Sequence, residues 1–390
     1  MAVISKCYIC NKNIIAEHSY DEHIILNSLG GKLKSKSLMC RPCSVSFDNI
    51  DTELSDSLNL FGLLLSIKRD RGENPRIKAI RTDNDKEIFI ESGGKPAFTD
   101  QPIIEYNLLD DKQFPIYIKA KNEPKMRQIL EGFKRKNPSL NVEEILNSAV
   151  SGQETIPIVH PLKNILFNDK QLRSICKMAI NFYMHFYVHH EGKRDLITHL
   201  IPYIKGECKN QYVNYYYPDE PIVTSNLSED SFIHTLFIKG NPEEKILYGY
   251  IELYSAFRLI ILLSDAYEES FFQKVYSFDV LSRKKVDKEI NINLSRKKIL
   301  DVVNNPEPPV KQIDIAIKDL QKGIVGHLIY HQLVDNLKNI LQEANFDEKM
   351  VQELIEKYFT KEKCNFIYRL DPALRIHEMN QLLSEVTRLA

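Results

Sequence analysis

Two close pairs of cysteines constrain the fold of this chain more than any other feature. Cys7 and Cys10 form one C-x-x-C motif, Cys40 and Cys43 form the other, and 29 residues separate them. Each motif lets two thiolates from one tight turn bind the same ion, and two such turns supply the four soft ligands of a tetrahedral site. Two separate redox motifs are the alternative. The N-terminus lacks the apolar run of a signal peptide, which predicts a cytoplasmic protein. In that compartment, the two cysteine pairs favour one structural Zn²⁺ over disulfides.

The segment between the two cysteine pairs contains a more specific pattern. It reads DEHII at residues 21–25 and LGG at residues 29–31. A histidine after an acidic residue, followed by Ile-Ile and Gly-Gly pairs between two C-x-x-C motifs, resembles the HNH endonuclease family and its ββα-metal fold. The similarity continues through KRDRG at residues 68–72 and GGKP at residues 93–96.

The resemblance implies a chemistry for this segment. Phosphodiester hydrolysis needs an activated water and positive charge beside the scissile phosphate. By position in the family pattern, His23 is the general base and Glu22 is a ligand of one catalytic Mg²⁺ or Mn²⁺, while the zinc holds strand and helix together. Outside this context, a Glu-His pair is more often an ordinary surface pair. His18 is a second imidazole in the segment, and a surface role is the simpler interpretation for it.

Two positions depart from the family pattern. Leu26 replaces the usual proline after the Ile-Ile pair, and Ser44 replaces the usual asparagine after the last zinc cysteine. The second departure removes the side chain that the helix normally offers to the catalytic ion. Asp48 lies four residues further along, on the same helical face, and its carboxylate would suit Mg²⁺ or Mn²⁺. The alternative is that Asp48 is a solvated helix residue, with Asn49 or Asp51 as the next candidates.

The whole chain is predicted to be an α+β protein in four parts. Residues 1–58 form a zinc-stabilised HNH-like module, and residues 59–150 form a β-rich extension followed by helix. Residues 151–302 form a larger mixed α+β domain of unknown role, and residues 303–390 form a helical region. The length of 390 residues is enough for roughly two to three buried cores.

Local patterns predict particular elements within these parts. The Asn-Asp pair at 168–169 predicts the start of a long helix with an apolar face. Segments 232–239 and 245–263 are rich in β-forming residues and predict strands of one mixed sheet. The sequence NNPEPP within 303–310 predicts a linker.

Basic residues that follow the module are candidates for contacts with a phosphate backbone. They lie in a charged turn and in the alternating strand after it: Lys68, Arg69, Arg71, Arg76, Lys78 and Arg81. Their closeness in sequence to the predicted active site favours phosphate contact. The alternative is an ordinary charged strand edge that prevents association between sheets.

The overall charge limits how this chain can bind nucleic acid. Lys and Arg total 52 and Asp and Glu total 53, which gives a formal charge of −1. Attraction to nucleic acid must therefore come from local patches. The longest apolar stretch is interrupted by charged residues, so we expect no membrane partner.

Together these patterns favour a metal-dependent endonuclease that hydrolyses phosphodiester bonds in nucleic acid, with DNA as the favoured substrate. Family association alone suggests a setting in bacterial restriction or phage defence. The parts after the module would regulate the nuclease, select its substrate, or bind a second copy of the chain or another protein. The alternative is a degenerate HNH module that keeps the zinc fold and binds nucleic acid or protein without cutting.

Overall fold

A computed structural model gives the structure of most of the chain up to residue 343. The described residues are 3–15, 19–82, 85, 87–97, 103–109, 112–120, 123–150, 158–159, 166–187, 192–219, 222, 231–287, 289–343, 349, 353, 381 and 384. His18 and nearly all of residues 344–390 lie outside them, so our expectations for these residues stay predictions.

The chain divides into two compact units. The first comprises Met1–Pro75 and Leu162–Ala390, and the second comprises Arg76–Pro161. The fold is α+β, as the sequence predicts. Residues of the N-terminal module and of the later sheet share one hydrophobic core in the first unit. The predicted boundary at residue 58 therefore lies inside a single packed unit.

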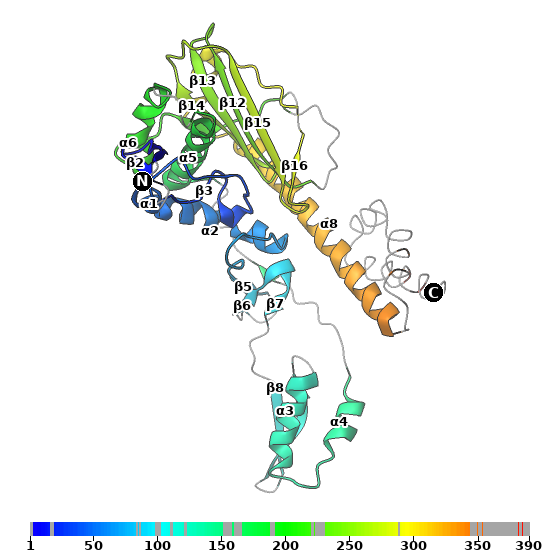
Figure 1. Cartoon of the computed structure of the whole chain (residues 1–390). Helices are drawn as coiled ribbons and strands as arrows, with labels where there is room; N and C mark the ends of the chain where they lie inside the picture. Colours follow the sequence, from blue (N-terminus) through cyan, green and yellow to red (C-terminus); the bar gives the residue numbers. More distant parts are fainter. Residues whose placement is uncertain are drawn as a thin grey trace. The chain divides into compact units, whose positions relative to one another are not determined.

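The N-terminal module consists of two short hairpins followed by two helices (Figure 1). These elements are β1 (Val3–Lys6), β2 (Asn13–Ile15), β3 (Glu22–His23), β4 (Lys34–Ser35), α1 (Arg41–Val45) and α2 (Asp48–Leu64). Strand β1 pairs with β2 and strand β3 pairs with β4, both antiparallel.

The loop between β3 and β4 depends on the Gly-Gly pair. The short 3-10 helix η2 (Asn27–Leu29) ends at Gly30, whose φ of 84° lies in the left-handed region. A Cβ atom at Gly31 would lie 2.1 Å from the carbonyl oxygen of Ile25. Only glycine allows the chain to fold back on itself at both positions without strain.

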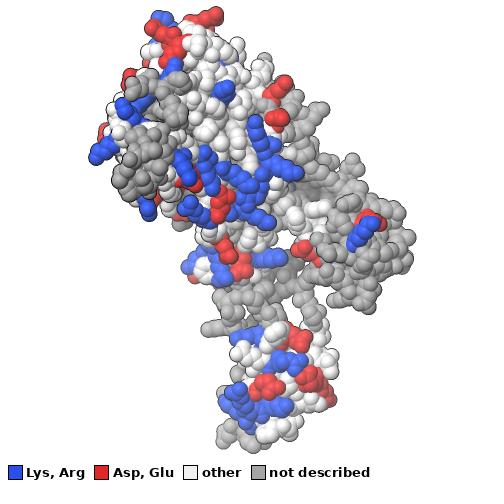
Figure 2. All heavy atoms as spheres, viewed as in Figure 1, with Lys and Arg blue, Asp and Glu red and all other residues white. Residues whose placement is uncertain are grey.

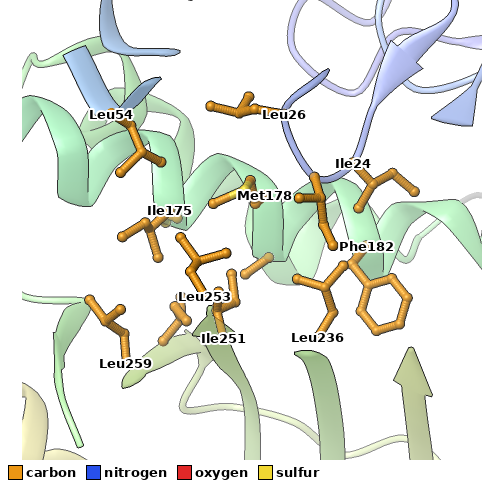
Figure 3. Packing of buried hydrophobic residues seen from close by; sticks show 14 of the residues in the cluster. Ile24, Leu26, Leu54, Ile175, Met178, Phe182, Leu236, Ile251, Leu253 and Leu259 are labelled. Atoms are coloured by element: carbon orange, nitrogen blue, oxygen red, sulfur yellow. The ribbon is translucent and has the colours of Figure 1, made fainter. Parts of the chain in front are cut away.

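Helix α5 (Asp169–His185) lies between the N-terminal module and the sheet of the first unit. Asn168 begins it with a capping box, because its side chain and that of Gln171 each accept the other's backbone N–H. Figure 3 shows the apolar side chains that meet there: Ile175, Met178 and Phe182 from α5, Ile24, Leu26 and Leu54 from the module, and Leu236, Ile251, Leu253 and Leu259 from the sheet. Because both sides of α5 are covered, every residue from Ser174 to Met184 is buried.

The sheet of the first unit has the strand order β11-β14-β13-β12-β15-β16. Its strands are β11 (Val213–Tyr215), β12 (Ile233–Asn241), β13 (Ile246–Leu253), β14 (Phe257–Ser264), β15 (Phe272–Asp279) and β16 (Lys284–Val286). Every neighbouring pair is antiparallel. The prediction of a mixed sheet is therefore wrong, because tight turns connect β12 to β13 and β13 to β14, and such turns require antiparallel strands.

Further helical segments complete the described part of the first unit. They are η4 (Asp195–Leu200), α6 (Ile201–Lys205), α7 (Arg296–Val303) and α8 (Val310–Glu343). The predicted linker falls between α7 and α8. Among the described residues, no helix is both long enough and apolar enough to cross a membrane.

The described residues of the second unit form a small sheet, a hairpin, a short 3-10 helix and two α-helices. Its elements are β5 (Ile77–Arg81), β6 (Glu87–Ile90), η3 (Ser92–Gly94), β7 (Pro96–Ala97), β8 (Ile103–Leu109), β9 (Lys112–Lys119), α3 (Glu123–Lys134), α4 (Val142–Ser148) and β10 (Ile158–Val159). The sheet has the order β10-β5-β6-β7, and β8 pairs with β9 alone.

In the first unit, His234 on β12 bonds the sheet directly to the N-terminal module. Its Nδ1 accepts the backbone N–H of Tyr254 at 3.1 Å, so Nε2 carries the proton and donates to the Leu29 carbonyl at 2.9 Å. Complete burial lowers the pKa of His234 to about 4. Protonation would break the bond from Tyr254 and place a charge in the core.

We predict an acid-labile contribution from His234 to stability. Between pH 6.5, the ordinary pKa of histidine, and pH 4, the folded-state pKa, the unfolded chain binds one more proton than the folded chain. The free energy of unfolding should therefore fall by about 3 kcal/mol across this window and be unaffected by His234 above it. Chemical denaturation at several pH values, compared between the native protein and His234→Gln, measures the effect. Parallel stability curves for the two proteins would contradict it.

Candidate functional site

The two C-x-x-C turns meet in the N-terminal module. Cys7 follows β1, Cys10 lies in the next turn, Cys40 precedes α1 and Cys43 lies within α1. The Cys7 carbonyl accepts the N–H of Asn11 at 2.8 Å. Asn11 has a left-handed φ of 60°, so the chain turns back immediately after the first pair of thiols.

The arrangement of these thiols fits a single Zn²⁺. The four sulfur atoms lie within 4.8 Å of one another, and those of Cys10 and Cys40 are 3.7 Å apart. Sulfur ligands at about 2.3 Å from a tetrahedral zinc lie about 3.8 Å from one another. Among the described residues, this is the one cluster of metal-binding type that the structure contains. The four cysteines named from the sequence therefore form one cluster that suits a structural zinc, and His23 is outside it.

Glu22 points into the interior and belongs to a buried polar network. Its carboxylate accepts the hydroxyl of Ser44 at 2.6 Å and the ammonium of Lys177 at 2.8 Å. The same ammonium lies 2.5 Å from Asp51 Oδ2. Asn181 adds an amide donor 3.4 Å from Glu22. Ser44 therefore keeps a bond to Glu22, and two carboxylates share one lysine.

Further bonds extend this network across the first unit. The Ser174 hydroxyl donates to Asp51 Oδ1 at 2.7 Å, and the Tyr8 hydroxyl donates to Asn181 Oδ1 at 2.7 Å. Tyr8 lies between the first two cysteines, whereas Ser174 and Asn181 belong to α5. The network thus joins the first cysteine turn, strand β3 and helix α2 to α5.

Lys177 is charged in this environment. Burial by itself would lower the pKa of Lys177, but the carboxylates of Asp51 and Glu22 outweigh that effect and raise it. Removing one partner of such a buried pair typically costs about 3–5 kcal/mol, because a charge is left uncompensated. Loss of either partner is therefore expected to destabilise the packing of the module against α5.

His23 has surroundings quite different from those of Glu22, because adjacent residues of a strand point to opposite faces. Its Nε2 lies 3.5 Å from Asp70 Oδ2, which is an electrostatic contact and not a hydrogen bond of good geometry. Asn27 holds Asp70 in place by accepting its backbone N–H at 2.8 Å. Burial is the largest influence lowering the pKa of His23, the Lys34 ammonium adds to it, and Asp70 opposes both.

Two cations share the carboxylate of Asp70 with His23. Lys34 on β4 forms an ion pair with it, and Arg283, between β15 and β16, contacts Asp70 Oδ1 at 3.0 Å. The bond from Lys34 is the largest cause of the lowered pKa of Asp70. Both cationic side chains reach solvent, with 28% and 24% of their surface exposed. Figure 2 shows Lys and Arg side chains gathered on one face of the first unit, with acidic side chains among them.

The structure does not bring Asp48 to either of these centres. Asp48 is exposed at the start of α2, and among the described residues no recorded hydrogen bond or ion pair joins it to Glu22 or His23. Asp51, one of the alternatives named from the sequence, is the α2 carboxylate that shares Lys177 with Glu22.

The basic residues named from the sequence fall into two groups. Lys68, Arg69 and Arg71 belong to the first unit, and Arg76, Lys78 and Arg81 belong to the second. The guanidinium of Arg69 donates to Asn59 and Asn74, so it holds its own turn together.

In the second unit, Arg76 and Lys78 form ion pairs with acidic residues at the two ends of β6. Arg76 lies 2.6 Å from Glu91, and Lys78 lies 2.6 Å from Glu87. Both cations are thus paired with carboxylates of their own sheet, in which β5 lies between β10 and β6. Phosphate contact by this group stays a prediction, and so does the alternative of a charged strand edge.

Sequence reasoning missed Lys177, Asp70, Lys34 and Arg283. Lys177 left one signal, because it is the single charged residue in the apolar stretch ICKMAINF at residues 175–182. Asp70 lies in the KRDRG motif, which was read only for its basic side chains. No local sequence pattern marks Lys34 or Arg283 as a residue of the candidate site.

Comparison with known proteins identifies the N-terminal module. Residues 7–59 match a family model described as HNH endonuclease. This segment is therefore similar to HNH endonucleases, and the match includes all four clustered cysteines. No curated protein and no solved structure matches the chain.

We predict that the full chain holds about one tightly bound zinc, the number that four thiolates can satisfy. Loss of a group that hydrogen-bonds to a metal ligand typically lowers metal affinity by roughly 10–100-fold. Cys40→Ser removes a ligand itself and should lower zinc affinity by more than this. It should also lower the melting temperature. Elemental analysis and thermal unfolding measure both effects, with Cys208→Ser as the matched control because Cys208 is an exposed cysteine outside the module. A zinc-free Cys40→Ser protein that melts like the native protein would contradict the prediction.

Proposed function

We propose that the N-terminal module hydrolyses phosphodiester bonds in nucleic acid, with DNA as the favoured substrate and His23 as the general base. The observation that carries this proposal is the group of His23, Asp70, Lys34 and Arg283. A histidine lies beside a carboxylate that two partly exposed cations also contact. The HNH family match over residues 7–59 supports the same class of reaction.

Each described side chain can have a separate role in hydrolysis. Asp70 faces Nε2 of His23 and acts as a positioning residue, so Nδ1 is the nitrogen that would take a proton from water as it attacks phosphorus. The bond from phosphorus to the leaving sugar oxygen breaks in the same step, and that oxygen takes a proton from solvent. The Lys34 ammonium and the Arg283 guanidinium would offset the negative charge that builds up on the phosphate oxygens. Each cation would exchange part of its contact with Asp70 for the substrate.

A catalytic Mg²⁺ or Mn²⁺ does not fit the donors that the resemblance assigns to it. Glu22 is the expected ligand, but Ser44 and Lys177 already occupy its oxygens. It also points to the opposite face of β3 from His23. The roles proposed for His23, Asp70, Lys34 and Arg283 use no divalent ion.

The Lys177 interaction also favours a second candidate function. If cleavage needs a divalent ion at Glu22, the protein is a degenerate HNH module that binds nucleic acid without cutting it. Lys34 and Arg283 would then contact the backbone, and His23 would have no chemical role. The setting in restriction or phage defence, and a regulatory or assembly role for the later parts of the chain, remain proposals from family association.

We predict that His23→Ala abolishes cleavage and leaves nucleic-acid binding nearly intact. Loss of general-base catalysis typically costs about 10²–10⁴-fold in rate. Plasmid and single-stranded substrates, incubated with Mg²⁺, with Mn²⁺ and with chelator, measure the rate. A gel-shift titration on the same samples measures binding.

The matched control is His199→Ala, which removes an exposed histidine of η4 outside the module and should cut at the native rate. Equal cleavage by His23→Ala and the native protein would overturn the assigned base. Binding without cleavage by the native protein in all three conditions would establish the second candidate instead.

A further inference from the structure

Lys177 is the charged group that α5 adds to the buried network. It lies on α5, outside the matched residues 7–59, and only 1% of its side chain is exposed. Lysine is almost never buried to this extent without a partner. Its ammonium lies 2.8 Å from Glu22 and 2.5 Å from Asp51, so two carboxylates fix its position.

Glu22 belongs to β3 and Asp51 belongs to α2. The HNH resemblance implies that the strand of the motif and the helical segment after the second cysteine pair hold the catalytic ion. An ion at the position of the ammonium would need to approach oxygen at about 2.0–2.1 Å for Mg²⁺, which small inward shifts of Glu22 and Asp51 would provide. The Ser44 hydroxyl and the Asn181 amide both donate to the carboxylate of Glu22. We propose that Lys177 takes the place of the divalent cation in this module. The native protein then binds zinc at its cysteines and no divalent ion between Glu22 and Asp51.

The packing around Lys177 holds its side chain in place, so that it cannot move aside to let an ion reach Glu22 and Asp51. Its neighbours Ile175, Cys176 and Met178 on α5 are completely buried. The ring of Phe47 lies 5.9 Å from the ammonium and covers a further side. The lysine cannot swing out to admit an ion unless α5 separates from the module.

Charge explains why the ammonium and a divalent ion exclude each other. Two carboxylates and one ammonium share this buried space, and a divalent ion placed beside the ammonium would be repelled strongly in a medium of low dielectric constant. Without the ammonium, two carboxylates would face each other uncompensated and would favour any cation that reaches them. Asp51 keeps 21% of its side chain exposed, which gives an ion a route from solvent.

The test is to remove the lysine from the full, zinc-loaded chain and ask whether Mn²⁺ restores what is lost. Melting temperature and Mn²⁺ binding by titration calorimetry are measured for the native protein, Lys177→Ala and Lys177→Ala/Glu22→Gln. Lys170→Ala is the matched control, because Lys170 lies on the same helix and pairs with Glu53 of α2 at the surface.

We expect Mn²⁺ to leave the melting temperatures of the native protein and of Lys170→Ala unchanged. Lys177→Ala should melt at a lower temperature and recover as Mn²⁺ is added, since a ligand that binds only the folded state stabilises it. The double variant should show no such recovery, because one of the two charged ligands is missing.

Two results would overturn the proposal. One is Mn²⁺ stabilisation of the native protein that disappears in Glu22→Gln, which would mean that an ion binds there despite Lys177. The other is a Lys177→Ala protein that gains neither Mn²⁺ binding nor stability, including one that fails to fold with Mn²⁺ present. Both readouts are independent of cleavage, so this proposal can fail while the proposed nuclease function stands, and the reverse.

Discussion

The ammonium of Lys177, held between the carboxylates of Glu22 and Asp51, is the interaction on which the first unit depends. A module this small has too little core to hold itself together, and a zinc ion at the four cysteines would supply part of what is missing. Here α5 supplies the rest, with apolar contacts on both of its sides and a buried charge at its centre. The module and the sheet that packs against α5 therefore share one core and belong to a single compact unit.

This interaction also separates two residues that the motif places side by side. Strand alternation sends Glu22 toward Lys177 and His23 toward Asp70. On the interior side of β3, Glu22 takes part in packing against α5. On the outer side, His23 lies with Asp70 in the group proposed to act on phosphate. Arg283, which comes from the end of the sheet, reaches that outer side, so the later part of the chain contributes directly to the candidate site.

Local sequence patterns predicted the parts of the molecule that depend on local physics. The cysteine spacing predicted that the four thiols meet in one cluster, the Gly-Gly pair predicted the turn after η2, and the Asn168 cap predicted the start of α5. Contacts between distant residues could not be predicted in the same way. Lys177 is 155 positions from Glu22 and Arg283 is 213 positions from Asp70, and no spacing rule connects them. Asp51, and not Asp48, contacts Lys177 because of the way α2 is rotated against α5. Only the packed structure defines that rotation.

The most direct test of the role of Lys177 is a crystal structure of the zinc-loaded chain soaked in Mn²⁺, with anomalous data collected to separate the two metals. We expect a zinc peak among the four cysteines, with the Lys177 side chain reaching Glu22 and Asp51 and no manganese peak between them. A manganese peak between those carboxylates, with Lys177 displaced, would show that the module keeps a divalent-ion site and would contradict the replacement of that ion by lysine.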